Sequence, residues 1–216
     1  MLQQIYQKLY NHFGPQNWWP AETPFEVIIG AILTQNTTWS NVEKAIENLE
    51  KQGLIGPEKL HKIENKDLEK LIISSGYYRQ KTKKIKNFTS FLWEKYDGKL
   101  KKLLELPSSR LREELLSIKG IGKETADSII LYAADKPVFV IDNYTKRVLS
   151  RVGITQEKNY DKLQELFHDK LPQDTQLFNE FHALLVNLGK DYCKRKPKCD
   201  NCPLNQVCEY AKSYNQ

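Results

Sequence analysis

The sequence predicts an all-α protein, and three observations support this prediction. Apolar residues recur at helical spacing along nearly all of the 216 residues. Several of these segments begin at helix-capping residues or end near glycine. Only one short run resembles a strand, and an isolated strand is not stable by itself. With 40% hydrophobic and 28% charged residues, the chain has the composition of a folded globular protein.

The first predicted helix opens the chain. Leu2, Ile5, Leu9 and Phe13 lie on one helical face. Gly14-Pro15 follows directly, and this pair is typical of a helix end. We therefore expect an amphipathic helix that ends near residue 13.

Two capping boxes predict the next two helices. In Thr23-Pro24-Phe25-Glu26, proline occupies the first helical position, and the helix should continue to Leu33. Ser40-Asn41-Val42-Glu43 has the same pattern and predicts a second helix start. The residues expected to point inward from that helix are Val42, Ile46 and Leu49.

Further helices are predicted along the rest of the chain. Ile85, Phe88 and Leu92 form an apolar face between Gly76 and Gly98. Helical spacing also covers residues 109–117, 123–134, 143–152, 159–168 and 176–188. The strand-like run, 138–141, is flanked by helices, so we expect it to be a buried extended connector.

The charge and the N-terminus limit the classes of partner and compartment. A net charge of +6 and a pI near 9.0 suit a polyanionic partner, although many basic proteins have none. No run of about 18 apolar residues occurs, which predicts no membrane span. Met1-Leu2-Gln3-Gln4 lacks the features of a signal peptide, which favours the cytoplasm, in association with the nucleoid if the source is prokaryotic.

The cysteines predict a metal site. The chain has four, arranged as Cys193-x5-Cys199-x2-Cys202-x5-Cys208. Disulfides usually join distant segments of secreted chains, whereas this compact group lies in a chain without a signal peptide. A structural zinc site commonly uses two Cys-x-x-Cys knuckles, and here there is one. Four closely spaced thiolates can also bind a [4Fe–4S] cluster, which is the interpretation we favour.

A glycine-rich hairpin is predicted between the helices at 109–117 and 123–134. It includes Gly120-Ile121-Gly122-Lys123. Glycines permit positive φ and let a phosphate approach the backbone, where a helix N-terminus would hold it. A bare Gly-x-Gly is also compatible with an ordinary helix–turn–helix corner.

Together with Val138-Phe139-Val140-Ile141-Asp142, this hairpin resembles the helix-hairpin-helix DNA glycosylase superfamily that includes endonuclease III. The resemblance covers the chain from Phe25 to Cys208 and includes the cysteine group. It implies that Asp142 is the essential carboxylate. Cleavage of an N-glycosidic bond builds positive charge on the sugar, which a carboxylate stabilises while it orients water. Asp142 could also cap the helix that starts at Asn143.

The hairpin departs from the bifunctional members of this superfamily at one position. Those members carry a lysine two residues after the second hairpin glycine, and its amine attacks the sugar. Glu124 occupies that position here. Lys123 is adjacent, but one residue along a helix rotates a side chain by about 100°. The resemblance therefore implies a monofunctional glycosylase, with lyase activity through Lys123 as the alternative.

The resemblance also implies residues that contact DNA and the base. Gln35 looks like the glutamine that fills the gap left by the flipped base, although a glutamine at a helix end is usually a solvated surface residue. Trp18, Trp19, Pro20 and Trp39 resemble the base pocket of 3-methyladenine glycosylases of the endonuclease III type. Indole rings attract a cationic alkylated base, but tryptophans also commonly fill cores.

The cysteine group departs from both branches of the superfamily. Endonuclease III has six residues in the first gap, where this chain has five, and the 3-methyladenine branch typically lacks the cluster. Between the first two cysteines lie four basic residues suited to DNA phosphates, although a basic run is usually a solvated face. They are Lys194, Arg195, Lys196 and Lys198.

The predicted architecture is two helical lobes that flank a DNA-binding cleft. Residues 22–134 would form a six-helix lobe with the hairpin, and 1–21 with 135–216 a second lobe with the cluster at 193–208. The expected activity is excision of an alkylated purine such as 3-methyladenine from double-stranded DNA by a monomer. The alternatives are an endonuclease III-type enzyme for oxidised, deaminated or mismatched bases, and a non-catalytic redox-sensing DNA-binding protein.

Overall fold

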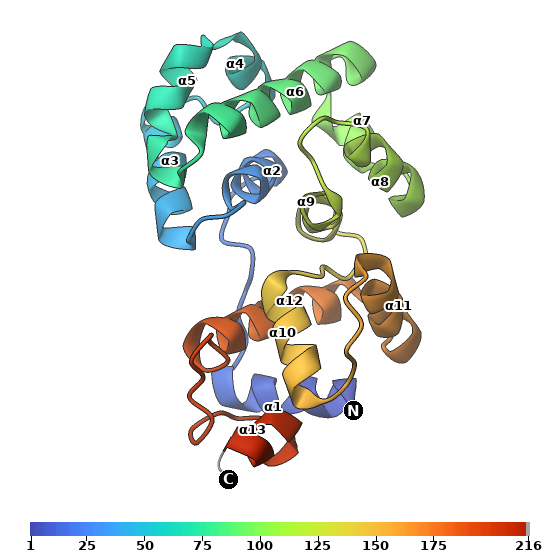
Figure 1. The fold of residues 1–216 in the computed structure, drawn as a ribbon. Helices are drawn as coiled ribbons and strands as arrows, with labels where there is room; N and C mark the ends of the chain where they lie inside the picture. The colour runs from blue at the N-terminus through green and yellow to red at the C-terminus, as the bar shows by residue number, and fades with distance from the viewer. Residues whose placement is uncertain (215–216) are drawn as a thin grey trace. The chain divides into compact units, whose positions relative to one another are not determined.

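The computed structural model describes residues 1–214, and within this range every regular element is a helix (Figure 1). The all-α prediction is therefore confirmed. The chain divides into two compact units, of which unit 1 is Met1–Pro20 with Pro137–Gln216 and unit 2 is Ala21–Lys136. None of the helices in residues 1–214 has the length and apolar character needed to cross a membrane.

Unit 2 is built around a helix that is apolar on every side. In α2 (Pro24–Leu33), all residues from Phe25 to Leu33 are buried, as expected for the central helix of a helical layer. The long helix α6 (Tyr78–Tyr96) packs against α2 and buries Ile85, Phe88 and Leu92, as predicted. The other helices of this unit are α3 (Trp39–Lys51), α4 (Pro57–Lys62), α5 (Asn65–Leu71), η1 (Ile73–Ser75), α7 (Leu100–Leu104), α8 (Ser108–Leu116), α9 (Lys123–Ser128) and η2 (Ile129–Ala133).

The two predicted capping boxes have different outcomes. The Thr23 side chain accepts the Glu26 backbone N–H at 3.2 Å, so the first box is confirmed. The Glu26 carboxylate returns to the N–H of Glu22, at 3.0 Å, one residue before the cap. The second prediction is wrong, because α3 begins at Trp39 with Thr38 as its N-cap. The Ser40 hydroxyl lies inside the first turn, 3.2 Å from the Thr38 hydroxyl.

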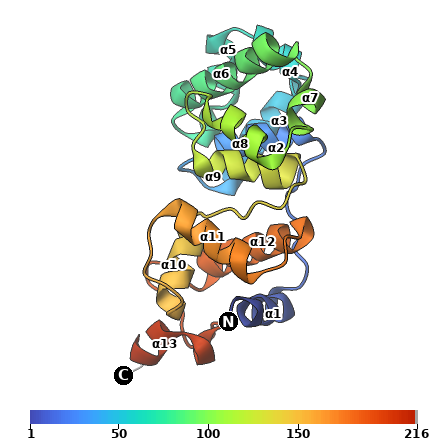
Figure 2. The same ribbon diagram turned by 90° about the vertical axis from the view of Figure 1, so that its right-hand side faces the viewer.

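Unit 1 packs its helices around α10 (Asn143–Val152) and α12 (Thr175–Asp191), which lie side by side. Gly189 permits this close approach, because a Cβ there would overlap the ring of Tyr144. The opening helix α1 (Leu2–Phe13) covers α12, and α13 (Glu209–Tyr214) packs against α10 (Figure 2). The remaining elements of unit 1 are α11 (Tyr160–Lys170) and η3 (Asn205–Val207).

The strand-like run is a buried extended connector, as predicted. Residues 138–141 are buried, and no strand pairs with them among residues 1–214. Side chains of α11 satisfy the backbone of Phe139 instead: Gln164 Nε2 donates to its oxygen at 2.7 Å, and His168 Nε2 accepts its N–H at 3.0 Å. The Phe139 ring also stacks on Phe167, with centroids 3.6 Å apart. A polar helix face thus replaces the neighbour that a sheet would supply.

The sequence prediction missed four short helices. These helices, of five to seven residues, are too short to produce a clear periodic pattern. They are α4, α5, α7 and α13. The predicted helix at 123–134 is present, but its second half widens into the π-helix η2.

Candidate active site

Asp142 is the N-cap of α10. One carboxylate oxygen, Oδ1, accepts the backbone N–H of Thr145 at 2.7 Å, so the predicted capping role is confirmed. The residue is only 9% exposed. Its other oxygen, Oδ2, lies 3.9 Å from Nε2 of His182 on α12. The capping hydrogen bond orients this carboxylate at the N-terminus of the helix.

His182 is a neighbour of Asp142 that the sequence analysis missed. The side chain is buried, and this burial lowers the pKa of His182, although the Asp142 charge opposes that effect. A neutral imidazole therefore faces the carboxylate near neutral pH. Nothing local in the sequence of α12 indicated that His182 would face Asp142.

The four cysteines line one cavity that is partly open to solvent. Cys199 and Cys208 are buried, and Cys193 and Cys202 are partly exposed. Burial raises the pKa of the Cys202 thiol to about 11, so a metal would have to displace its proton. Within residues 1–214, no set of three or more His, Cys, Asp or Glu side chains could hold a metal ion as arranged. Four thiols are a donor set that suits zinc or an iron–sulfur cluster.

Two arginines of α10 attach the cysteine loop to the helix that Asp142 caps. Arg147 donates to the carbonyl of Cys193 at 2.6 Å and to that of Gly189 at 3.1 Å. Arg151, one turn further along, donates to the carbonyl of Lys194 at 2.6 Å and to the Cys193 sulfur at 3.4 Å. Their spacing of four residues was a signal in the sequence that both side chains point the same way.

The basic residues of this loop face solvent. Lys194, Arg195, Lys196 and Lys198 are all exposed, while Pro197 between them is partly buried. Arg151 of α10 donates to the backbone carbonyls of Lys194 and Arg195, so the backbone of the loop is fixed while its basic side chains are exposed to solvent.

The hairpin connects α8 to α9 in unit 2. Gly120 adopts a φ of 101°, whereas Gly122 is extended with a φ of −96°, so only the first glycine uses positive φ. A Cβ on Gly122 would meet nothing within 4 Å, which leaves its backbone open to an approaching group. A Cβ on Gly120 would lie 2.6 Å from Cγ of Lys84 on α6.

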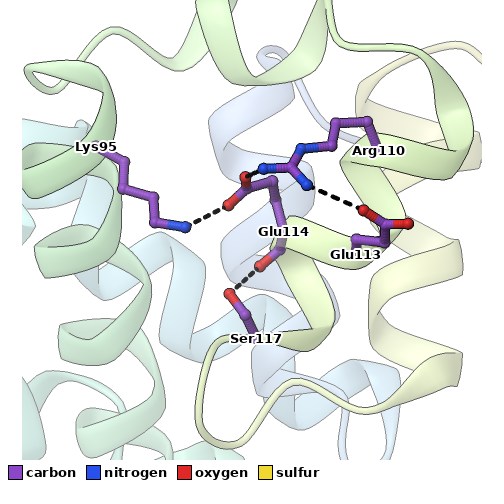
Figure 3. Close-up of polar contacts among 5 residues, drawn as sticks. All are labelled: Lys95, Arg110, Glu113, Glu114 and Ser117. Atoms are coloured by element: carbon purple, nitrogen blue, oxygen red, sulfur yellow. Dashed lines mark hydrogen bonds and ion pairs between the residues drawn. The ribbon is translucent and has the colours of Figure 1, made fainter.

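A buried carboxylate fixes the helix that leads into the hairpin. Glu114 of α8 accepts from Lys95 of α6 and from Arg110, both at 2.7 Å (Figure 3). These interactions hold the pKa of Glu114 below its usual value, although burial raises it. Ser117 then caps the end of α8 by donating to the Glu114 carbonyl at 2.7 Å. Asn87 of α6 also binds the hairpin directly, at the Lys119 carbonyl.

Gln35 follows α2 and is held by two side chains of the same unit. Its Nε2 donates to the Thr125 hydroxyl of α9 at 2.9 Å, and Lys84 Nζ donates to its Oε1. Below this loop, the buried ammonium of Lys81 donates to the carbonyls of Leu33 and Ser75 at 2.7 and 2.6 Å. Burial and the Lys84 charge lower the pKa of Lys81 to about 8. The sequence analysis missed all three partners of this loop, which are 46 or more residues away from it in the chain.

The predicted base-pocket residues are divided between the units. Trp18, Trp19 and Pro20 belong to unit 1, and Trp39 belongs to unit 2. The Trp18 and Trp19 rings are half-buried and nearly perpendicular, at 79° with centroids 5.7 Å apart. Perpendicular rings cannot stack on opposite faces of one base, so only one of this pair can present its face to it.

The segment before these tryptophans is anchored to α12. Glu180 accepts the backbone N–H of Gln16 at 2.7 Å, and Asn187 donates to the Gln16 side-chain oxygen. Gln16 Nε2 in turn donates to the carbonyl of Gly14 at 2.8 Å. Burial raises the pKa of Glu180, despite its bond to Gln16. The same helix that carries His182 thereby sets the position of the tryptophan segment.

Lys123 and Glu124 form the first turn of α9, and both are exposed. The adjacent Thr125 is buried, because helix rotation turns each successive residue to a new direction. Glu124, an exposed carboxylate, therefore occupies the position at which bifunctional members of the superfamily carry a lysine.

The sequence matches a family model and a curated relative, both of which are described as DNA repair proteins. A family model described as HhH-GPD superfamily base excision DNA repair protein matches residues 29–173. A Methanocaldococcus jannaschii protein provisionally named as a DNA repair glycosylase is 47% identical over 211 residues, covering 96% of each chain.

Two solved structures share the fold. A structure of a non-covalent endonuclease III–DNA complex superposes with a TM-score of 0.85 and 25% identity, covering 100% of this chain and 98% of that one. The 3-methyladenine DNA glycosylase of H. pylori, bound to 1,N6-ethenoadenine, gives a TM-score of 0.76 and 30% identity, covering 88% and 97%. The chain therefore belongs to the HhH-GPD superfamily of base excision DNA repair proteins and is a DNA glycosylase of the endonuclease III and 3-methyladenine glycosylase type.

Proposed function

We propose that this glycosylase hydrolyses the N-glycosidic bond of a flipped alkylated purine, such as 3-methyladenine, in double-stranded DNA. The observation that carries the proposal is Asp142, a buried carboxylate oriented by its own helix N-terminus. As the base leaves, positive charge develops on the sugar, and this carboxylate stabilises it. Asp142 also orients the water that adds to the anomeric carbon.

A single carboxylate is sufficient for an alkylated purine. Adenine methylated at N3 is cationic, so it departs as a neutral base and needs no general acid. The indole face of Trp18 or Trp19, together with Trp39 and Pro20, would attract such a ring. The solved relative that holds 1,N6-ethenoadenine supports the same substrate class.

The proposed reaction is hydrolysis without strand cleavage. A lyase requires an amine that attacks the sugar. Glu124 stands at the position of that amine in bifunctional relatives, and Lys123 points in another direction along α9. Borohydride trapping tests this point, because only a Schiff base is reduced to a stable adduct; a trapped adduct that Lys123→Met removes would contradict it.

The protein would bind DNA as a monomer through both units. In unit 2, the backbone at Gly120 and Gly122, with Lys123, would hold a phosphate, and Gln35 would fill the space left by the flipped base. In unit 1, the exposed residues Lys194, Arg195, Lys196 and Lys198 would contact further phosphates. The relative solved as a DNA complex supports this mode of binding.

We also propose that Cys193, Cys199, Cys202 and Cys208 hold a [4Fe–4S] cluster. The cavity that their thiols share supports this assignment. When bound, the cluster supplies four covalent attachments that fix the loop at 193–208. Arg147 and Arg151 then hold the backbone of this loop against α10, while its basic side chains face outward.

The decisive experiment measures release of free bases from methylated duplex DNA, resolved by chromatography. We expect 3-methyladenine from the wild-type protein and almost none from Asp142→Asn, which keeps a capping side chain. Asp174→Asn is the matched control, since Asp174 caps α12 of the same unit through the Leu177 N–H at 2.6 Å. If methylated bases stay attached, the alkylpurine assignment fails, and oxidised and deaminated bases become the substrates to test.

A further inference from the structure

The side-chain amide of Gln35 is turned toward the protein. Its Nε2 donates to the hydroxyl of Thr125, a residue only 7% exposed, and its Oε1 accepts from Lys84. Both polar ends of the amide are therefore bound within unit 2. An amide in this position cannot at the same time reach into a DNA duplex, so Gln35 must break these hydrogen bonds before it can fill a gap in the base stack.

Lys84 connects Gln35 to the hairpin. Its aliphatic chain lies against Gly120, so closely that a Cβ on the glycine would be 2.6 Å from Cγ and 3.2 Å from Cδ and Cε. The same side chain therefore touches the proposed phosphate-binding backbone and donates to Gln35. The partner of this ammonium is a neutral amide oxygen rather than a carboxylate.

A phosphate at the hairpin would compete for this ammonium. An ammonium bound to a phosphate gains an attraction between two opposite charges, which the neutral amide oxygen of Gln35 cannot supply. The base of the loop would stay in place during the exchange, because Lys81 holds the carbonyls of Leu33 and Ser75. Only the side chains of Lys84 and Gln35 need to move.

We propose that Lys84 and Thr125 are positioning residues that hold Gln35 retracted in the DNA-free protein, and that a DNA phosphate at the hairpin draws Lys84 away and releases Gln35. This inference rests on the gap-filling role of Gln35 in the proposed function. It adds the device that couples DNA contact at the hairpin to insertion of that side chain.

The retracted state is tested without DNA, by NMR relaxation of the Gln35 side-chain amide, identified by its loss in Gln35→Ala. We expect an amide as rigid as the backbone in the wild-type protein, and a mobile one in Thr125→Val. Thr82→Val is the matched control, since Thr82 is a buried threonine of the same unit whose hydroxyl has no hydrogen-bond partner in the structure. A Gln35 amide that is already as mobile in the wild-type protein as that of the exposed Gln3 would overturn the inference.

The release is tested by stopped-flow fluorescence, with 2-aminopurine beside an abasic-site analogue in a duplex. Insertion appears as a phase that does not depend on protein concentration. Loss of one neutral hydrogen bond should make this phase about three- to tenfold faster in Thr125→Val, and leave it unchanged in Thr82→Val. A rate within twofold of wild type, or slower, would overturn the inference.

Lys84→Met tests the second half of the device. This variant removes the hydrogen bond to Gln35, so insertion of Gln35 should be faster. It also removes the proposed phosphate contact, so the magnitude of the slope of log K for DNA binding against log salt should fall by about 0.9. Lys83→Met, the same change at an exposed neighbour, should not accelerate insertion. An unchanged insertion rate in Lys84→Met contradicts the exchange.

Gln35→Ala separates this inference from the proposed function. It should abolish the insertion phase. If the phase persists in Gln35→Ala, the gap-filling role itself is wrong and the release falls with it. If Gln35→Ala removes the phase but Thr125→Val does not accelerate it, the gap-filling role stands and only the positioning by Lys84 and Thr125 fails.

Discussion

The two units hold their candidate functional residues in different ways. In unit 1, Asp142 is oriented by its own helix, through a hydrogen bond to a residue three positions away. In unit 2, Gln35 is oriented by Lys84 and Thr125, which are 49 and 90 positions away in the chain. The carboxylate proposed to stay in place is thus built into a helix end, whereas the side chain proposed to move is held by contacts that can be exchanged.

The cationic anchors of the two units are of different chemical types. Arg147 and Arg151 of α10 hold the backbone of the cysteine loop in unit 1, and Lys81 of α6 holds that of the Gln35 loop in unit 2. Arginine has donors in a rigid fork that can bind several carbonyls at once. Lysine places a compact ammonium at the end of a flexible chain, and its pKa shifts readily on burial.

The largest expected effect separates the chemical role of unit 1 from the insertion role of unit 2. Asp142→Asn should lower the single-turnover rate of base release by about 10²–10³-fold, because it removes the charge that stabilises the sugar cation. Gln35→Ala should cost less, about tenfold, because it removes stabilisation of the flipped state only. If the two variants lose the same factor in the rate of base release, the proposed division between a chemical role for Asp142 and an insertion role for Gln35 is wrong.

The next effect concerns stability. Lys81→Met should lower the free energy of unfolding by about 2–4 kcal/mol, because it leaves two buried carbonyls without their charged donor. Lys83→Met, at an exposed position two residues further along α6, should change it by less than about 0.5 kcal/mol. Urea unfolding followed by circular dichroism measures both variants, and a loss below about 1 kcal/mol in Lys81→Met would contradict the anchoring role.

The stability of the protein should depend on pH in two separate ranges, an acidic one that His182 of unit 1 determines and an alkaline one that Lys81 of unit 2 determines. His182 in unit 1 has a lowered pKa, so the unfolded chain binds its proton first, and stability is lost as the pH falls below about 6.5. Lys81 in unit 2 has a pKa of about 8 in the folded protein and 10.5 in the unfolded chain. Between these pH values the unfolded chain binds the extra proton, so the free energy of unfolding should increase as the pH rises from about 8 to 10.5. Urea titrations at several pH values measure both effects. The free energy of unfolding should depend less on pH in the acidic range for His182→Gln, and less in the alkaline range for Lys81→Met. A profile unchanged by its variant would refute that assignment.

The smallest effect concerns the basic loop of unit 1. Lys196→Met should reduce the salt slope of DNA binding by about 0.9, the value of one phosphate contact, with little change in base preference. Lys62→Met, in an exposed ion pair with Glu58 in unit 2, is the matched control and should leave the slope unchanged. Fluorescence anisotropy at several salt concentrations measures both, and equal slopes for Lys196→Met and wild type would exclude this phosphate contact.

Local patterns in the sequence predicted the parts of the molecule that depend on neighbouring residues. The caps at Thr23 and Asp142 and the long helices α6, α10 and α12 follow from side chains within one or two turns. The same local reasoning misplaced the start of α3. Ser40 and Glu43 fit the pattern of a capping box, whereas the true N-cap, Thr38, does not have a Glu or Gln three residues later. A motif of four residues cannot distinguish two nearby starts when packing decides between them.

The sequence by itself determined the fold class, most of the longer helical segments, the buried connector and the family, because apolar periodicity and short motifs are properties of adjacent residues. Only the tertiary structure decided that His182 faces Asp142, that the four thiols share one cavity, and that Lys84 and Thr125 hold Gln35. These contacts join residues from different helices. Their partners are selected by how the helices pack, which no local pattern of the sequence records.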